Sequence, residues 1–320
     1  MNFSWATIAV AGAFALAQPA PDTPNIKVEV DLVRISCVVT GPTEAPVQGL
    51  KAEDFVLRED GARQNVEYLW QERDLPLTLV IVAELRGTLR DLTVHQQVAA
   101  RLLEHLISAN DRAAIVTVLI QPWLVTDLTN SIDQLRTGAE FPNHPGRILG
   151  RPCSGVHAGA LSSPEAPCGN NPIWNAVFFS AELGLHRQIG RKALLLLSDG
   201  LDTGSDYTLD DATAACQRAD APVYAVRYIS DAWRAHGGPD WVMQGKRDLT
   251  RIAHQTGGAA FDGKWDTMQD VFDRIESDLR NQYVLGYKPR SRRNRKDHRI
   301  TVQVTRPGLI VRAQERLYSQ

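Results

Sequence analysis

The sequence predicts an α/β protein in which a doubly wound, mostly parallel sheet is flanked by a β-sandwich formed by the N- and C-terminal strands. The main observation is the run Lys192–Ser205, in which four consecutive leucines precede Ser198-Asp199-Gly200. A continuous apolar run that ends in turn residues is typical of a buried parallel strand. Around it, apolar runs alternate with helical patterns, whereas both ends of the chain show strand patterns. The carboxyl end of this central strand is therefore the expected ligand-binding edge.

The N-terminal part, residues 25–73, is expected to form the first half of the sandwich. Apolar and polar residues alternate over Asn25–Thr40, and shorter strand patterns follow at Asp54–Arg58 and Gln64–Trp70. Glu59-Asp60-Gly61 separates the two short strands. An Asp-Gly pair between alternating runs predicts a β-hairpin.

The middle part, residues 74–281, alternates between strand and helix patterns. The predicted strands are Leu77–Ala83, Asp111–Ile120, Trp123–Asp127, Ala193–Ser198, Pro222–Tyr228 and Ala259–Phe261. The predicted helices are Asp91–Ser108, Ser131–Leu135, Pro172–Leu185, Asp206–Ala219, Gly245–Thr256 and Thr267–Asn281. Such alternation predicts a parallel sheet with helices on both faces. Residues 137–171 are expected to form a long loop that is either functional or partly disordered.

The C-terminal part, residues 282–320, returns to strand patterns at Gln282–Tyr287, His298–Thr305 and Leu309–Arg316. The basic connection KPRSRRNRKD between the first two is most simply a solvated hairpin tip, although its charge would also suit anionic lipid or another polyanion. The two ends of the chain are expected to complete each other's sheets, with the α/β domain inserted between them.

Composition and charge narrow the functional classes. The 320 residues carry a formal net charge of −2, so no global field draws the chain to nucleic acid or to a membrane. Residues 1–18 predict a signal peptide, because an uncharged apolar run ends in the small-x-small pattern Ala15-Leu16-Ala17. An anchored N-terminal helix is the alternative. The mature protein is expected to be secreted or periplasmic, without a stable membrane anchor.

The cysteines of an exported protein meet an oxidising compartment. Cys153 and Cys168 flank one irregular stretch and are candidates for a disulfide. Cys37 falls in a strand pattern and Cys216 in a helix pattern, which predicts buried thiols. The spacing matches no zinc site, and the sequence contains no Gly-x-Ser-x-Gly elbow and no Gly-rich phosphate loop.

Six short segments carry a resemblance to a known family. They are Leu50–Phe55, Leu75–Leu77, Asn110–Arg112, Ser198–Gly200, Gln282–Tyr287 and Arg306–Leu309, in this order. With them, the middle of the chain resembles a von Willebrand factor type A (vWA) domain, and most of the chain resembles bacterial vWA-related proteins of the acidobacterial type. The resemblance implies a Rossmann-like vWA fold, a role in protein binding or adhesion, and a metal-ion-dependent adhesion site at the carboxyl edge of the sheet.

The family's site binds Mg²⁺ through an Asp-x-Ser-x-Ser run, a later Thr, and an Asp after the central strand. Local alignment places Glu84, Arg86 and Thr88 at the three positions of that run. Asn171 falls at the Thr, and Asp199 alone matches the family residue. A guanidinium carries a fixed positive charge and only donors. Arg86, placed between Glu84 and Asp199, is therefore expected to pair with both carboxylates and take the place of the metal.

The resemblance thus predicts a degenerate, metal-free adhesion site that binds a protein partner in the cell envelope or outside the cell, with no cofactor, no enzymatic activity and no nucleic acid. Asp202 is expected to extend an acidic rim or to cap a helix. Four alternatives stay open. In the first, Glu84, Thr88 and Asp199 retain Mg²⁺, and in the second, Arg86 points to solvent. In the third, Glu84 and Asp199 are the acid and base of a hydrolase. In the fourth, the protein is a purely structural envelope component.

Overall fold

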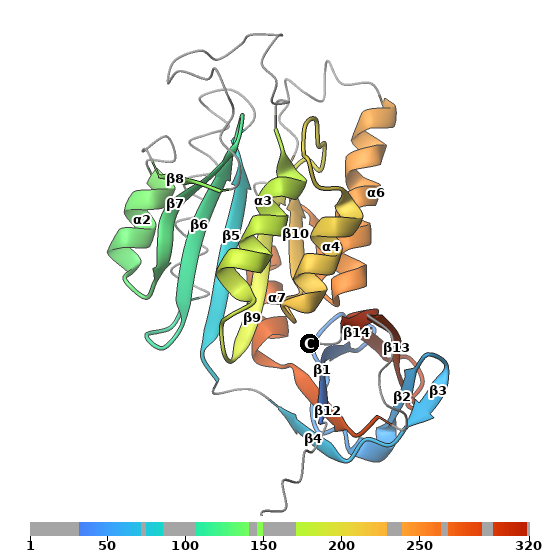
Figure 1. Ribbon diagram of the computed structural model, residues 1–320. Coiled ribbons are helices and arrows are strands. Elements are labelled where there is room, and N and C mark those ends of the chain that lie inside the picture. The colour runs from blue at the N-terminus through green and yellow to red at the C-terminus, as the bar shows by residue number, and fades with distance from the viewer. Residues whose placement is uncertain are drawn as a thin grey trace, which may run out of the picture. The chain divides into compact units, whose positions relative to one another are not determined.

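Within the described residues, a central sheet of seven strands has the order β11-β10-β9-β5-β6-β7-β8 (Figure 1). The strands are β5 (Leu77–Glu84), β6 (Arg112–Val118), β7 (Pro122–Thr129), β8 (Arg147–Ile148), β9 (Arg191–Ser198), β10 (Val223–Arg227) and β11 (Ala259–Asp262). Neighbours from β11 to β6 are parallel, and β7 and β8 are antiparallel additions. The predicted mostly parallel sheet is confirmed, and β8 lies in what the sequence indicated as a loop.

The computed structural model describes residues 32–71, 75–85, 107–140, 146–149, 171–228, 239–263, 268–289 and 297–318. The chain from Leu32 onward forms one compact unit. The predicted signal peptide over residues 1–18, most of the expected helix Asp91–Ser108, and the pair Cys153 and Cys168 lie outside the described residues. These expectations, and the expected domain limits at residues 74 and 281, stay predictions.

Helices cover both faces of the central sheet. They are α2 (Ile132–Glu140), α3 (Ile173–Phe179), which continues into the π-helical segment η2 (Ser180–Leu185), α4 (Leu209–Arg218), α6 (Pro239–Thr256) and α7 (Met268–Arg280). The core on one face takes side chains from α3, α4 and α6, and the core on the other takes them from α2 and α7. In Figure 1, α3 and α4 lie in front of the sheet and α7 behind it. None of the helices in the described ranges is both long and apolar enough to cross a membrane.

Strand β5 shows why both faces need a cover. Val80 and Val82 point into one core, and Leu79 and Ile81 point into the other. Every residue of β5 is buried, as expected for a strand with helices on either side. A fully buried side chain of this kind contributes about 1.5–3 kcal/mol relative to an exposed one, so the apolar run itself fixes β5 in the interior.

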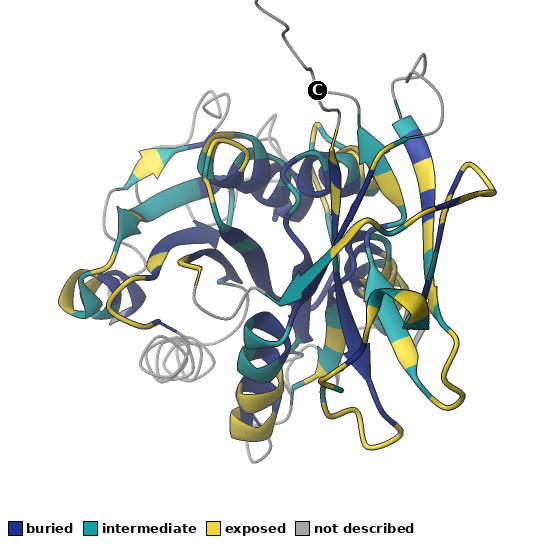
Figure 2. Cartoon of the chain, turned by 90° about the horizontal axis from the view of Figure 1, so that it is seen from below, coloured by how far each residue is buried: buried dark blue, intermediate teal, exposed yellow. Residues whose placement is uncertain are grey.

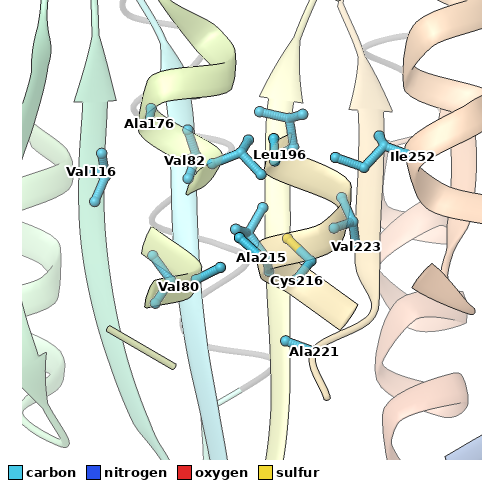
Figure 3. Packing of buried hydrophobic residues seen from close by; sticks show 14 of the residues in the cluster. Val80, Val82, Val116, Ala176, Leu196, Ala215, Cys216, Ala221, Val223 and Ile252 are labelled. Atoms are coloured by element: carbon cyan, nitrogen blue, oxygen red, sulfur yellow. The ribbon is translucent and has the colours of Figure 1, made fainter. Parts of the chain in front are cut away.

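Small side chains bring α3 and α4 close to the sheet. Ala176 of α3 and Ala215 and Cys216 of α4 lie in the same core as Leu196 of β9 (Figure 3). Cys37 and Cys216 are both free and buried, as predicted. Burial raises the pKa of each thiol to about 12, which keeps both in the unreactive protonated form.

Two helices begin at places that the sequence did not indicate. The helix α4 begins after Thr208, not at Asp206, because the Thr208 hydroxyl accepts a hydrogen bond from the Asp211 amide at 3.1 Å while Asp211 accepts from the Thr208 amide at 2.9 Å. The helix α6 begins at Pro239 and runs through Gly245, where the sequence placed its start. Gly245 serves a different purpose, since a Cβ there would lie 2.2 Å from the Asp199 carbonyl oxygen.

The other predicted helices that fall on described residues agree with the structure in kind and differ at their ends. The helix α2 extends to Glu140 instead of ending at Leu135. Pro172 precedes α3 as its N-cap residue and does not occupy the first helical turn. Gly257 follows α6 with a φ of 84°, which is the left-handed conformation expected after a helix end.

Strands from both ends of the chain build two four-stranded sheets, β14-β1-β12-β4 and β15-β13-β2-β3. Their bounds are β1 (Val33–Thr40), β2 (Phe55–Glu59), β3 (Ala62–Gln64), β4 (Tyr68–Gln71), β12 (Tyr283–Tyr287), β13 (Asp297–Val304), β14 (Ile310–Ala313) and β15 (Arg316–Tyr318). A shared apolar core joins the two sheets, and exposed residues gather on loops and outward faces (Figure 2). The predicted sandwich is confirmed.

Two predicted strands are in fact divided between the sheets of the sandwich. The run Gln64–Trp70 contributes β3 to one sheet and β4 to the other, and Leu309–Arg316 is divided in the same way between β14 and β15. Alternation indicates an extended chain and cannot show where it changes sheets. The predicted hairpin is confirmed, because Glu59 pairs with Ala62 across Asp60-Gly61, and both turn residues have positive φ.

Candidate functional site

The carboxyl ends of β5 and β9 meet at the topological switch point of the sheet. The two strands are neighbours, and the chain goes from β5 to β6 on one side and from β9 to β10 on the other. Ligands of open α/β sheets bind in the crevice at such points. Glu84 ends β5, and Ser198 ends β9 just before Asp199, so the topology brings these polar side chains to the expected edge.

Glu84 is the centre of a buried hydrogen-bonded cluster. Its residue exposure is 3%. Its Oε1 accepts from Asn171 Nδ2 at 2.8 Å, and its Oε2 accepts from Ser198 Oγ at 2.7 Å and from the Asp199 amide at 3.0 Å. Three donors from two other segments of the chain thus converge on one carboxylate, as a buried charge requires.

Asn171 is held in place by its backbone as well as by its side chain. Its φ is 69°, in the left-handed region that Asn tolerates better than most residues. Its amide donates to the Leu119 carbonyl at 2.7 Å, and Nδ2 donates to the Leu201 carbonyl at 2.8 Å in addition to Glu84. Asn171 is 2% exposed, and its Oδ1 has no hydrogen-bond partner among the described residues. Within that part of the chain, the site therefore contains a buried acceptor that is not used by the fold.

The turn after β9 is tied to the same cluster. Ser198 Oγ accepts from the Gly200 amide at 2.9 Å, and Asp199 Oδ1 accepts from the Leu201 amide at 2.8 Å. Gly200 has a φ of 84°, and a Cβ there would lie 2.4 Å from the Gly245 carbonyl oxygen. Only glycine fits this close approach of α6 to the turn. The turn that carries Asp199 is consequently rigid on both sides.

Asp202 does not join the cluster around Glu84. Its Oδ1 accepts from the Trp174 amide at 3.2 Å and from Ser205 Oγ at 2.5 Å. Ser205 Oγ in turn accepts from the Asn175 amide at 3.0 Å. Asp202 and Ser205 therefore accept hydrogen bonds from amides in the first turn of α3, a helix that precedes them in sequence. The sequence predicted that Asp202 would extend an acidic rim or cap the helix that follows it.

Of the site residues that the sequence indicated, the structure brings Glu84, Asn171 and Asp199 together. Arg86 and Thr88 lie outside the described residues, so the exchange of a metal for the Arg86 guanidinium stays a prediction. Ser198 was missed as a partner of Glu84. Its signal was a hydroxyl directly before the aspartate at the end of a buried strand, where a polar side chain needs a buried partner.

Among the described residues, hydrogen-bond donors surround the Glu84 carboxylate. Mg²⁺ requires oxygen lone pairs that converge on one point. Here both Glu84 oxygens accept hydrogen bonds, and Asn171 turns its NH₂ group, not its oxygen, towards them. In the parts of the chain that the structure describes, no group of three His, Cys, Asp or Glu side chains is arranged to hold a metal ion.

Helix α6 carries an exposed aromatic side chain one turn from its contact with this edge. Trp241 lies one turn before Gly245 on the same face of α6, and Gly245 contacts the backbone of Asp199 and Gly200. Trp241 is 59% exposed. Large exposed aromatic residues beside a polar, rigid turn are typical of protein-binding surfaces.

Comparison with known proteins gives similarities of fold only. No family model and no curated protein matches the chain. Proximal thread matrix protein 1 from the mussel byssus matches 78% of this chain at 10% identity and a TM-score of 0.45, and the chain spans 50% of the length of that protein.

Two bacterial structures match with similar values. BatB from Bacteroides thetaiotaomicron has 12% identity and a TM-score of 0.41 over 62% of this chain and 97% of that protein. The vWF domain of the type V pili tip protein Mfa5 from Porphyromonas gingivalis has 10% identity and a TM-score of 0.41 over 63% of this chain and 94% of that domain. At such identities and TM-scores, no ligand or partner of these proteins transfers to this chain.

Proposed function

We propose that this protein is an exported vWA-like module that binds a protein partner through the carboxyl edge of its central sheet, at a degenerate adhesion site that works without a metal. The observation that carries the proposal is the cluster at Glu84, where three protein donors take the positions around the carboxylate that a cation and its ligands would need.

The rigidity of the edge supports a role in binding. The turn from Ser198 to Leu201 is held by its own hydrogen bonds and by the contact between Gly200 and Gly245. A surface that keeps its shape loses little entropy when a partner binds. Trp241, one helical turn before Gly245 on α6, supplies the kind of exposed aromatic anchor that contributes most of the energy at many protein interfaces.

The proposed module is not an enzyme. A hydrolase that used Glu84 as its acid or base would need one carboxylate oxygen within reach of the substrate. Glu84 is buried and both of its oxygens are engaged with protein donors. Binding is therefore the better proposal. The proposed export rests on the signal-peptide pattern of residues 1–18, and it places the partner in the cell envelope or outside the cell.

Crosslinking to envelope extracts tests the interface. We expect the wild-type chain to capture a defined set of partners, and Trp241→Ala and Asp199→Ala to lose them. Tyr68→Ala is the matched control, because Tyr68 is an aromatic residue of 50% exposure on β4 of the sandwich. Equal loss in Tyr68→Ala, or unchanged partners in both site variants, would move the interface away from the sheet edge.

Calorimetric titration with Mg²⁺ and Mn²⁺ tests the proposed metal-free state separately. We expect no stoichiometric binding to the wild-type chain, because protein donors already engage both oxygens of Glu84. Tight one-to-one binding of either ion to the wild-type chain would contradict the proposal and restore the alternative with Mg²⁺ at Glu84, Thr88 and Asp199.

A further inference from the structure

A cavity of about 520 Å³ lies beside β11, which is the last strand of the central sheet at one end. All four residues of β11 line it, together with residues of α7, of β14 and of the turn after β1. Alternate side chains of a strand point to opposite faces of the sheet. A cavity that touches four consecutive residues therefore faces the edge of the strand, where the backbone groups lie.

The backbone of β11 presents every second peptide unit to this cavity. The Gly263 amide donates to the Arg227 carbonyl of β10 at 2.9 Å. In a parallel strand, the N–H and C=O groups of alternate residues point to the same side. The N–H and C=O groups of Ala259 and Phe261 therefore face β10. The N–H and C=O groups of Ala260 and Asp262 face away from β10, towards the cavity.

The carbonyl of Gly258, just before β11, also points away from β10, and it already accepts a hydrogen bond. Arg312 of β14 donates from Nη1 to the Gly258 carbonyl at 3.3 Å and from Nη2 to Asp278 Oδ2 at 2.6 Å. The next outward groups along the strand are those of Ala260, which is exposed. Across the ranges that the structure describes, no strand pairs with this side of β11. An unpaired edge of this kind is a template for another extended chain.

The side chains that line the cavity leave room for one extended segment more readily than for the sheet of a second protein. Val271 and Arg274 of α7 and Ile310 and Arg312 of β14 line the cavity beside this edge, and the ion pair between Arg312 and Asp278 joins β14 to α7 there. A second copy of this protein that paired through its own β11 would bring its neighbouring strands and helices against these walls. One extended segment needs only the strand spacing of about 4.8 Å, so a recessed edge suits it.

The charges on the walls indicate the chemistry of that segment. Arg274 pairs with Glu44 and lies over the Phe261 ring at 5.2 Å from its centroid. Asp262 pairs with Arg227 and Lys246, and Asp278 pairs with Arg312.

Asp270 is the lining carboxylate for which the described part of the chain shows no ion pair, and it is exposed. Asp270 is therefore the lining charge with which a basic side chain of a bound segment can pair. Phe261, Val271 and Ile310 add apolar surface.

We infer that this cavity binds an extended, partly apolar segment of a partner protein, which adds as a strand to the free edge of β11 and places a lysine or arginine against Asp270. Main-chain hydrogen bonds to Ala260 would give affinity, and the side-chain pockets on the walls would give specificity. This inference concerns a different end of the sheet from the site at Glu84 and does not depend on the proposed function.

The probe for this test is a display library of random eight-residue peptides, selected against the full chain. We expect enriched peptides to alternate apolar and polar residues and to carry a basic residue. Calorimetry with one enriched peptide then measures the effect of Ala260→Pro, which removes the outward amide and leaves the hydrogen bonds to β10 in place. Loss of one backbone hydrogen bond should weaken binding roughly tenfold.

Matched variants separate the two contacts. Ala260→Ser keeps the amide and should bind as the wild type does. Asp270→Asn should weaken binding by a factor of about two to five, as for an exposed ion pair. Asp273→Asn removes a carboxylate from the same helix outside the cavity and should have no effect.

Several results would overturn the inference. One is the absence of enriched peptides, and another is unchanged affinity in a folded Ala260→Pro variant. A third is a wild-type dimer in sedimentation that the peptide dissociates, because a second copy would then be the occupant of the cavity. If Ala260→Pro does not fold, N-methylation of the peptide backbone replaces it. Hydrogen exchange at the amides of Ala260 and Asp262 should slow when the unmethylated peptide binds, and an unchanged rate would also refute strand addition.

Discussion

Replacing the Glu84 carboxylate by an amide of the same shape, Glu84→Gln, is expected to destabilise the folded protein. The carboxylate accepts from Asn171 on one oxygen and from Ser198 and the Asp199 amide on the other. The amide of glutamine has one acceptor oxygen and one NH₂ donor. In either orientation, the NH₂ group faces at least one of the existing donors.

The size of the effect follows from the two orientations. If the NH₂ group faces Asn171, that side chain can rotate to offer its unused Oδ1, but it then loses the hydrogen bond to the Leu201 carbonyl. If the NH₂ group faces Ser198 and the Asp199 amide, two donors lose their acceptor. A hydrogen bond to a charged group contributes about 1.5–3 kcal/mol. In either orientation, the remaining hydrogen bonds to residue 84 become bonds between neutral groups and at least one bond is lost outright, which gives an expected destabilisation of about 2 kcal/mol.

Equilibrium urea unfolding measures this difference directly. Glu53→Gln is the control, because the Glu53 side chain is 74% exposed and lies in the short 3-10 helix Ala52–Asp54 before β2. We expect the control to unfold at the wild-type urea concentration. A difference of less than about 0.5 kcal/mol between Glu84→Gln and the wild type, which is the range of ordinary surface substitutions, would refute the account of the cluster.

Three further predictions concern other parts of the fold. Gly245→Ala should lower the thermal unfolding temperature, because its Cβ would lie 2.2 Å from the Asp199 carbonyl oxygen and α6 would have to move; an unchanged temperature would show that the helix shifts freely. Burial raises the pKa of the Asp111 carboxyl, but hydrogen bonds from backbone amides and a serine hydroxyl outweigh burial and lower it overall. The folded pKa of Asp111 lies below the unfolded value of about 3.9. The ionised carboxyl therefore stabilises the folded protein above that pH, and this stabilisation is lost as the pH falls through the folded pKa. Asp111→Asn should reduce the loss of stability in acid, and an acid unfolding profile identical to that of the wild type would contradict this. In a Cys153→Ser, Cys168→Ser background, a thiol reagent should label Cys37 and Cys216 only after unfolding, because burial raises the pKa of both thiols to about 12; rapid labelling of the native protein would be the opposite result.

The sequence by itself determined the elements and their burial. Continuous apolar runs identified β5 and β9 as strands covered on both faces, since each residue of such a run must avoid water whichever face it points to. The Asp60-Gly61 pair identified a hairpin because few other residues adopt positive φ in a tight turn. Glu84, Asn171 and Asp199 were indicated as site residues by their resemblance to a known pattern, before any geometry was available.

Only the tertiary structure decided which residues meet. Asn171 and Glu84 are 87 positions apart, and their contact depends on the neighbour relation of β5 and β9, which periodicity does not encode. In the same way, Asp202 caps a helix that precedes it, Gly245 is required by the backbone of a distant turn, and two alternating runs are each shared between two sheets. Local sequence patterns show whether a side chain faces water or the core. Which distant residues it contacts depends on how the chain connects the strands and helices, and packing over the whole core determines those connections.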